Sequence, residues 1–283
     1  MKILITGGAG FLGRELVKVI LKGRFGKYQE IRVFSRDEAK HHSFRMELSK
    51  SKQTEEIIYK DGKIKFIVGD IRDYNAIEKA TEGVDLVIHA SALKQVPVCE
   101  IYPMEAVYTN ILGSYNLIRA CQKNKVKKVI GISSDKACEP ITVYGMTKAI
   151  MERLFQNAKG KTNFTLVRYG NVISSIGSVV PLFEYQKENN LPITVTHKDM
   201  KRFFIDVSFA VDMIIWAYKH GKSGEIATPD LKPVSIDDLA RKYGKVIYTG
   251  IRPNEKIEEI LVSDVEKKNT HQRGKYKVIR SIL

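Results

Sequence analysis

Tyr144 and Lys148 are the residues whose types and spacing most directly suggest chemistry. They lie four positions apart in a segment with helical spacing, after the apolar run 129–132, so both side chains should share one face of a helix. A lysine ammonium beside a phenol favours the phenolate and lowers a pKa that starts near ~10. We expect this pair to remove a proton from a substrate hydroxyl; the alternative is two solvated helix residues.

A glycine-rich turn belongs to the first element that must position such a pair. Residues 2–6 form an apolar strand, residues 7–13 read GGAGFLG, and residues 14–21 have helical spacing. The spacing fits G-x-G-x-x-G, in which the backbone approaches a pyrophosphate at a helix N-terminus. The turn therefore predicts a dinucleotide site rather than a flexible loop. The predicted cofactor contacts in it are Gly7, Ala9, Gly10, Phe11, Leu12 and Gly13.

The end of the second predicted strand, 30–34, favours NADP over NAD. An NAD site usually has an acidic residue there to hold the ribose 2′-hydroxyl. Here Ser35 and Arg36 follow the strand, with Lys40 beyond, and a hydroxyl and a guanidinium suit a 2′-phosphate. The alternative for Arg36 is an ordinary surface residue.

Later strand ends supply the other predicted cofactor contacts. The Asp70 carboxylate is expected to meet an adenine amino group or to cap a helix, and the small residues Ala90 and Ser91 let a nicotinamide ribose lie close. His89 is expected to pack within its strand. The cofactor set beyond the glycine turn is Ser35, Arg36, Lys40, Asp70, Ile71, Ala90, Ser91, Lys94, Thr109, Tyr144, Lys148 and Val172.

Alternating apolar strands and amphipathic helices predict an α/β fold with a Rossmann-type doubly wound parallel sheet. Further strands are expected at 64–68, 84–90, 128–133 and 164–168, and helices at 104–124, 143–159 and 178–189; residues 40–63 should form a helix and an exposed excursion. We expect residues 1–170 to form the nucleotide-binding domain, with 203–220 returning to it. Residues 171–202 and 221–283 should form a smaller C-terminal substrate-binding cap.

Composition excludes several classes of function. The net charge of +15 is large, but the lysines are dispersed, so we expect phosphate-bearing ligands and no nucleic acid. The three cysteines and six histidines show no metal-ligand spacing, so no metal is expected. No apolar run reaches the ~18 residues of a membrane helix, and the N-terminus lacks a signal-peptide layout. We expect a cytoplasmic protein.

Taken together, the glycine turn, a Ser-Asp-Lys loop at 134–136 and the Tyr-x-x-x-Lys pair resemble the extended short-chain dehydrogenase/reductase superfamily. Segments 92–97, 134–137, 168–172, 177–181 and 250–256 further resemble its configuration-inverting UDP-N-acetylglucosamine 4,6-dehydratases. Nucleotide-sugar epimerases usually carry Ser-Ser or Ser-Thr at the Asp-Lys position, and glucose-type dehydratases carry Asp-Glu. The sequence departs from this family at Lys201, where threonine is usual, and in a short tail after Val262.

The resemblance implies an NADP-dependent lyase that makes a UDP-4-keto-6-deoxy-N-acetylhexosamine with C5 inverted, for surface glycan or nonulosonate synthesis. Its implied catalytic residues are Asp135, Lys136, Tyr144 and Lys148. In the implied mechanism, one of Asp135 and Lys136 acts as the acid and the other as the base. Both would be neutral, which burial against the sugar and nicotinamide favours; the alternative is a salt-bridged loop pair. The implied substrate contacts are Lys94, Ser134, Asn171, Val180, Arg202, Arg252 and Glu255.

A homo-oligomer, either a dimer built on paired helices or a hexamer, is also implied by the resemblance. Two other functions fit the same motifs. A nucleotide-sugar 4-epimerase would yield a product of unchanged mass, whereas a dehydratase removes water. A non-catalytic NADP-binding regulatory module would bind the cofactor and yield no 4-keto product.

Overall fold

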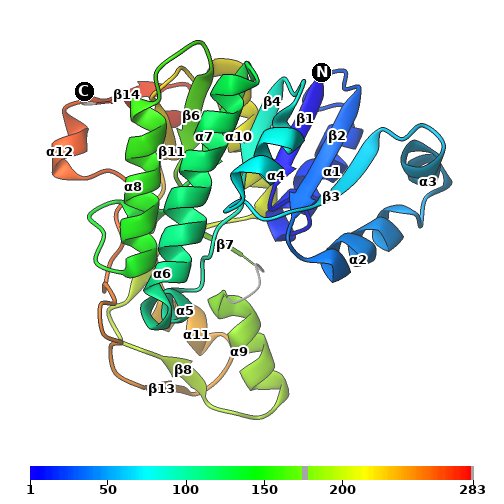
Figure 1. Cartoon of the computed structure of the whole chain (residues 1–283). Coiled ribbons are helices and arrows are strands. Elements are labelled where there is room, and N and C mark those ends of the chain that lie inside the picture. The colour runs from blue at the N-terminus through cyan, green and yellow to red at the C-terminus, as the bar shows by residue number, and fades with distance from the viewer. Residues whose placement is uncertain (174–177, 282–283) are drawn as a thin grey trace.

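The computed structural model describes residues 1–173 and 178–281. Its main sheet consists of β1 (Lys2–Thr6), β2 (Glu30–Ser35), β3 (Ile64–Val68), β4 (Leu86–His89), β5 (Lys128–Ile132), β6 (Asn163–Val167), β11 (Ile226–Pro229), β14 (Thr270–Arg273) and β15 (Tyr276–Ile279). The order is β14-β15-β11-β6-β5-β4-β1-β2-β3 (Figure 1). The strands from β3 to β11 are parallel. This confirms the predicted Rossmann-type doubly wound sheet, whose order reverses between β1 and β4.

Helices cover both faces because successive strand residues point to opposite sides of a sheet. The helices involved are α1 (Phe11–Leu21), α2 (Glu38–Leu48), α4 (Tyr74–Thr81), α7 (Gly113–Lys123), α8 (Val143–Asn157) and α10 (Val207–His220). Ile3 and Ile5 of β1 pack in one apolar cluster with α1, α2 and α10. Leu4, between them, packs in a second cluster with α4, α7 and α8. Burial on both faces explains why these strands read as continuous apolar runs.

Two predicted elements differ in the structure. The excursion expected within 40–63 contains a second helix, α3 (Lys52–Tyr59), because Ile57 and Ile58 pack against the α1 and α2 cluster. The helix expected at 104–124 is divided into α6 (Pro103–Ala106), a π-helical turn η1 (Val107–Leu112) and α7. A π turn shifts the side-chain register and commonly marks a functional site.

The predicted division into domains is wrong for three strands. We assigned residues 221–283 to the cap, yet β11 extends the parallel sheet beside β6, and β15 and β14 add an antiparallel edge. Hydrogen bonding to β6 draws this segment into the sheet, and the buried Tyr276 and Val278 pack there. Residues 174–177 and 282–283, also within the predicted cap ranges, lie outside the described residues.

A smaller lobe lies at the carboxyl ends of the parallel strands (Figure 1). It contains α9 (Val179–Glu188), β8 (Ile193–Val195), α11 (Ile236–Arg241) and β13 (Val246–Tyr248), with an apolar core around Phe183. Short ladders pair β7 (Asn171–Val172) with β10 (Phe204–Ile205) and β9 (Lys201–Arg202) with β12 (Val234–Ser235). The other short helices are α5 (Val96–Ile101), η2 (Asp135–Ala137) and α12 (Asp264–Lys267). In residues 1–173 and 178–281, no helix is both long and apolar enough to cross a membrane.

Arg168, at the end of β6, lies at the centre of a buried ion cluster. Its guanidinium is 1% exposed and donates two hydrogen bonds to Glu152 of α8, at 2.9 and 2.7 Å. It donates two more to Glu266 of α12, at 2.8 and 2.7 Å. Burial alone would raise the pKa of Glu266, but the Arg168 contacts lower it to about 2. The cluster therefore ties the sheet, α8 and the C-terminal segment together.

Replacing Arg168 with methionine should destabilise the fold strongly. The change leaves two buried carboxylates without their cation, a loss of about 3–5 kcal/mol in the free energy of unfolding. Arg153→Met is the matched control, since Arg153 is exposed on the same helix as Glu152. Urea denaturation at pH 7 measures both variants, and equal losses from the two substitutions would contradict the central role of Arg168.

Candidate active site

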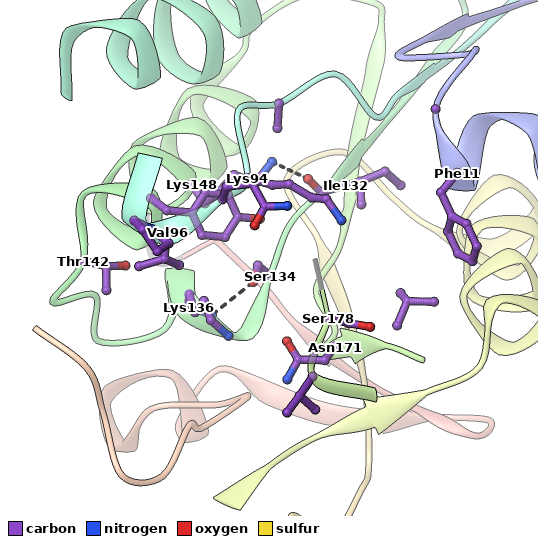
Figure 2. Close-up of a pocket in the computed structure, with 18 of the residues that line it drawn as sticks. Phe11, Lys94, Val96, Ile132, Ser134, Lys136, Thr142, Lys148, Asn171 and Ser178 are labelled. Carbon is purple, nitrogen blue, oxygen red and sulfur yellow. Dashed lines mark hydrogen bonds between the residues drawn. The ribbon is translucent and has the colours of Figure 1, made fainter. Parts of the chain in front are cut away.

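A cavity of about 1330 Å³ lies between the carboxyl edge of the sheet and the smaller lobe. One small-molecule pocket usually occupies about 300–1000 Å³, so this cavity has room for two ligands. Figure 2 shows Lys136 and Ser134 of the loop after β5 on one wall, with Asn171 and Ser178 of the lobe facing them. Lys148 points into the same space from α8.

The glycine turn at one end of the cavity has the geometry of a dinucleotide cradle. Gly7 adopts φ +68°, and a Cβ on it would lie 2.8 Å from the Ala90 carbonyl oxygen. A Cβ on Gly13 would lie 2.5 Å from the Cα of Gly8, so no side chain fits there. The first turn of α1 begins at Phe11, and its N–H groups have no partner within the helix. These residues fit a pyrophosphate.

Most of the predicted cofactor residues line the cavity. They are Gly7, Gly10, Phe11, Leu12, Gly13, Ser35, Arg36, Lys40, Ile71, Ala90, Ser91, Lys94, Thr109, Tyr144, Lys148 and Val172. Ala9 does not line it, because it packs in the core at 1% exposed. Asp70 does not line it either, because its carboxylate accepts hydrogen bonds from Arg72. It caps no helix, since Asp73 caps α4.

The positively charged residues after β2 each lie beside a carboxylate of the same chain. Arg36 lies 3.6 Å from the Asp70 carboxylate and is half exposed. Lys40 lies 2.8 Å from Asp37, the residue that caps α2. The Ser35 hydroxyl is 2.5 Å from the Nε2 of His41. The two cations therefore stand at the cavity edge, each beside an acid.

Tyr144 and Lys148 lie one turn apart at the start of α8, where Thr142 caps the helix through the Gly145 N–H. The Lys148 ammonium donates to the Ile132 carbonyl oxygen at 2.5 Å (Figure 2). Burial lowers its pKa to about 8. Burial also raises the pKa of the Tyr144 phenol, and a hydrogen bond with Ser134 opposes this. The lowering of this pKa by Lys148 stays a prediction.

Asp135 and Lys136 form an ion pair in η2 rather than the predicted neutral pair. The Lys136 Nζ lies 3.1 Å from Asp135 Oδ1 and 3.4 Å from Glu259 Oε1. Burial acts to lower the pKa of Lys136, but the two carboxylates outweigh it and the pKa is raised. The neutral forms were predicted for a site that holds sugar and nicotinamide, so they stay a prediction. Sequence reasoning did not include Glu259. Lys136 lines the cavity, whereas Asp135 is fully buried and does not.

The predicted substrate residues that line the cavity are Lys94, Ser134, Asn171, Arg202, Arg252 and Glu255. Val180 is buried in α9 and does not line it; in the same motif, Gly177 lies outside the described residues. The Arg202 guanidinium donates to the carbonyl oxygens of residues 201, 256 and 257. Most of its hydrogen-bond donors therefore bind the backbone of the smaller lobe. Arg252 is exposed, and no ion pair holds its guanidinium among the described residues.

Sequence reasoning missed two residues of this site. Asn110 is 1% exposed in η1, and its amide bonds both the N–H and the carbonyl of Leu93 and also Thr147. A polar residue within an apolar helical pattern was the available signal. Glu259 lines the cavity at 4% exposed, and its position depends on a contact 123 residues away in sequence, so no local pattern indicated it. In the described part of the chain, no cluster of His, Cys, Asp and Glu could hold a metal.

Comparison with known proteins identifies relatives over nearly the whole chain. A family model described as "Polysaccharide biosynthesis protein" matches residues 3–281. A protein of Rickettsia bellii (strain RML369-C) named UDP-glucose 4-epimerase is 42% identical over 287 residues, which cover 97% of this chain and 81% of the relative.

Solved structures share the same fold. The X-ray structure of Pen from Bacillus thuringiensis matches with a TM-score of 0.91 and 36% identity, covering 100% of this chain and 90% of that one. DesIV, a dTDP-glucose 4,6-dehydratase from Streptomyces venezuelae solved with NAD and TYD bound, matches with a TM-score of 0.77 and 19% identity. This match covers 95% of this chain and 90% of DesIV. The fold is that of extended short-chain dehydrogenase/reductases.

The low pKa of Lys148 predicts a specific pH dependence of stability. Its pKa is about 8 in the folded chain against 10.5 ordinarily, so the unfolded chain binds the extra proton between these values. The contribution of Lys148 to the free energy of unfolding therefore rises as the pH increases from 8 to 10.5, by about 3 kcal/mol in total.

Comparing the wild type with Lys148→Met isolates this contribution, because other titrating groups are common to both proteins. Urea denaturation measures the free energy of unfolding at pH 7.5 and at pH 10. Between these two pH values, this free energy should rise less, or fall more, in the variant than in the wild type. If the free energies of unfolding of the two proteins change by the same amount across this pH range, Lys148 is not held in a desolvated position.

Proposed function

Because the chain belongs to the polysaccharide biosynthesis protein family, we propose that it is an NADP-dependent UDP-N-acetylglucosamine 4,6-dehydratase that inverts C5. The proposed product is a UDP-4-keto-6-deoxy-N-acetylhexosamine for a surface glycan or nonulosonate. The supporting observation is Lys136, an amine on the cavity wall between two carboxylates. A 4-epimerase needs proton transfer at one hydroxyl, whereas removal of water also needs a base at C5 and an acid at C6.

The proposed cofactor would be held at the glycine turn, with Arg36 and Lys40 near its 2′-phosphate. A bound nicotinamide would supply reversible hydride transfer, so that hydrogen lost from C4 of the sugar could be regained at C6. Tyr144 takes the proton of the C4 hydroxyl. The positive charge of Lys148, one turn along α8, would favour the phenolate.

The 4-ketone acidifies the hydrogen on C5, and Lys136 removes that proton as a neutral amine. A proton passing from Lys136 to Asp135 yields this amine together with a carboxylic acid. Asp135 does not line the cavity, but the Ser134 hydroxyl does and lies 2.9 Å from Asp135 Oδ1. The proton of Asp135 would pass through this hydroxyl to the C6 hydroxyl, which would leave as water. Protonation of C5 by a water molecule on the opposite face would invert that centre. The hydroxide so formed would take up the proton that Tyr144 removed from the C4 hydroxyl.

The uridine diphosphate is assigned to the lobe side of the cavity. The first residues of α9 line it there, and helix N-termini favour phosphate groups. Arg252 offers a guanidinium for bidentate phosphate binding. Glu255 accepts the Arg252 backbone N–H at 3.2 Å, so it shapes the turn that carries this arginine. A cytoplasmic location stays a prediction.

The second candidate function is a 4-epimerase, which the names of the Rickettsia relatives favour. An epimerase would use Tyr144 and the nicotinamide and would not need Lys136. A non-catalytic NADP-binding module is the third possibility. The mass of the product formed from UDP-N-acetylglucosamine separates all three.

Lys136→Ala should abolish dehydration while leaving NADP affinity nearly unchanged, because the glycine turn is intact. We expect a loss of at least about 100-fold in the rate of water release, the lower range for a general acid or base. Mass spectrometry of the nucleotide sugar measures the rate, and NADP titration measures affinity.

Lys198→Ala is the control: it removes an exposed lysine of the smaller lobe, and its dehydration rate and NADP affinity should match those of the wild type. Wild-type protein that isomerises the sugar without loss of water, at a rate unchanged by Lys136→Ala, would establish the epimerase. Wild-type protein that binds NADP and yields no product would establish the regulatory module.

We also propose a homodimer formed through η1, α7 and α8. Tyr108, Leu112 and Tyr115 follow one another at helical intervals and are 42–46% exposed. Met146 and Ile150 form a second stripe on α8 and are 46–47% exposed. The two helices lie side by side on one face of the sheet (Figure 1). Such a continuous apolar face on paired helices is suited to a twofold contact.

Ile150→Glu should weaken this dimer by at least about tenfold, because it places a charge within an apolar contact. Light scattering after size-exclusion chromatography measures the mass across a dilution series. Val265→Glu is the control, since Val265 is the more exposed residue, at 68%, and lies on α12. A wild type that stays monomeric at high concentration would contradict the proposal.

A further inference from the structure

Lys136 faces a second carboxylate from a distant part of the chain. Glu259 follows β13 and is 4% exposed, with Oε1 at 3.4 Å from the Lys136 ammonium. Asp135 approaches the same nitrogen at 3.1 Å. The lysine thus lies between a carboxylate of the sheet loop and one of the segment that closes the cavity. Both Lys136 and Glu259 line the cavity.

The backbone around Glu259 is anchored beside the loop after β5. The Lys256 ammonium donates to the Cys138 carbonyl at 2.8 Å and lies 3.7 Å from Glu259 Oε2. Arg202 bonds the carbonyl oxygens of residues 256 and 257. These contacts fix the carboxylate against Lys136.

One oxygen of this carboxylate is left without a hydrogen bond. Glu259 Oε2 is buried and has no hydrogen-bond partner among the described residues. A buried oxygen in this position costs stability, and an amide or apolar residue would avoid part of that cost. The negative charge at this position is therefore better explained by its ion pairs with Lys136 and Lys256 than by packing.

We propose that Glu259 is a positioning residue that, together with Asp135, holds the Lys136 ammonium at the cavity wall and sets the pH at which Lys136 becomes a free amine. Its catalytic consequence rests on the proposed dehydratase function; its effect on the lysine does not. The charged or titratable groups around Lys136 are Asp135, Glu259, Arg202, Lys256 and Tyr144. Arg202 opposes the two carboxylates.

Removing the Glu259 charge should move the titration of Lys136 to lower pH by about one unit, the lower range for an opposite charge within ~4–6 Å. Glu259→Gln keeps the size of the side chain, and Glu259→Asp keeps its charge. Glu258→Gln is the matched control, because Glu258 is adjacent and exposed and pairs with Lys201 instead.

Brief acetylation with acetic anhydride at a series of pH values reports the free-amine fraction of each lysine, and peptide mass spectrometry measures Lys136 separately. We expect a lower midpoint in Glu259→Gln, with midpoints near the wild type in Glu259→Asp and Glu258→Gln. An unshifted midpoint in Glu259→Gln, or an equal shift in Glu258→Gln, would overturn the proposal. Matching thermal melting temperatures establish that each variant is folded.

A second measurement follows the same variants with UDP-N-acetylglucosamine. If the protein is a dehydratase, the low-pH limb of its rate profile should move with the acetylation midpoint in Glu259→Gln and stay in place in Glu258→Gln. A limb that fails to move while the acetylation midpoint does would separate Glu259 from catalysis. Absence of any product in the wild type would contradict the proposed function, while the acetylation result would still decide the role of Glu259.

Discussion

The buried Arg168 cluster is the interaction on which the active-site geometry depends. Glu152 accepts a hydrogen bond from Ser133 at 2.6 Å, and Cys138 donates to Glu266 at 3.5 Å. Both ends of the loop 133–138 therefore rest on the two carboxylates that Arg168 holds. A buried charge that loses its partner costs several kcal/mol, so the loop cannot shift without breaking this cluster. The lysine and tyrosine that face the cavity gain their fixed positions from it.

The residues of the site come from two lobes, and charged residues of the two lobes face one another across the cavity. The sheet lobe supplies the glycine turn, Tyr144, Lys148 and Lys136, and the smaller lobe supplies Arg252 and Glu259. Glu259 of the smaller lobe contacts Lys136 and, together with Asp135, raises the pKa of its amine. Substrate that excludes water from this contact would change the balance between desolvation and attraction. Lys136 would then be charged at rest and neutral when the proposed reaction needs it.

Much of the fold followed from local sequence patterns. The apolar runs predicted the doubly wound parallel sheet, because buried strands have a short-range pattern. The glycine turn predicted a dinucleotide cradle, because glycines leave room near the backbone. The strands β11, β14 and β15 were missed, since strand pairing at a sheet edge is decided by tertiary contacts. The helix α3 was missed because most of its residues are polar, and Ile57 and Ile58 alone pack against the core. Glu259 and Asn110 were missed because their roles depend on contacts with residues that are distant in sequence. The raised pKa of Lys136 in the chain alone could not be predicted, because the second carboxylate was unknown.

The central claim is that the sugar loses water between C5 and C6 while hydrogen removed from C4 is returned at C6. The most direct test uses UDP-N-acetylglucosamine that carries deuterium at C4, followed by proton and deuterium magnetic resonance of the product. Our account predicts a 4-keto product that has lost water and carries the deuterium in its C6 methyl group. A product of unchanged composition with the deuterium still on C4 would contradict it.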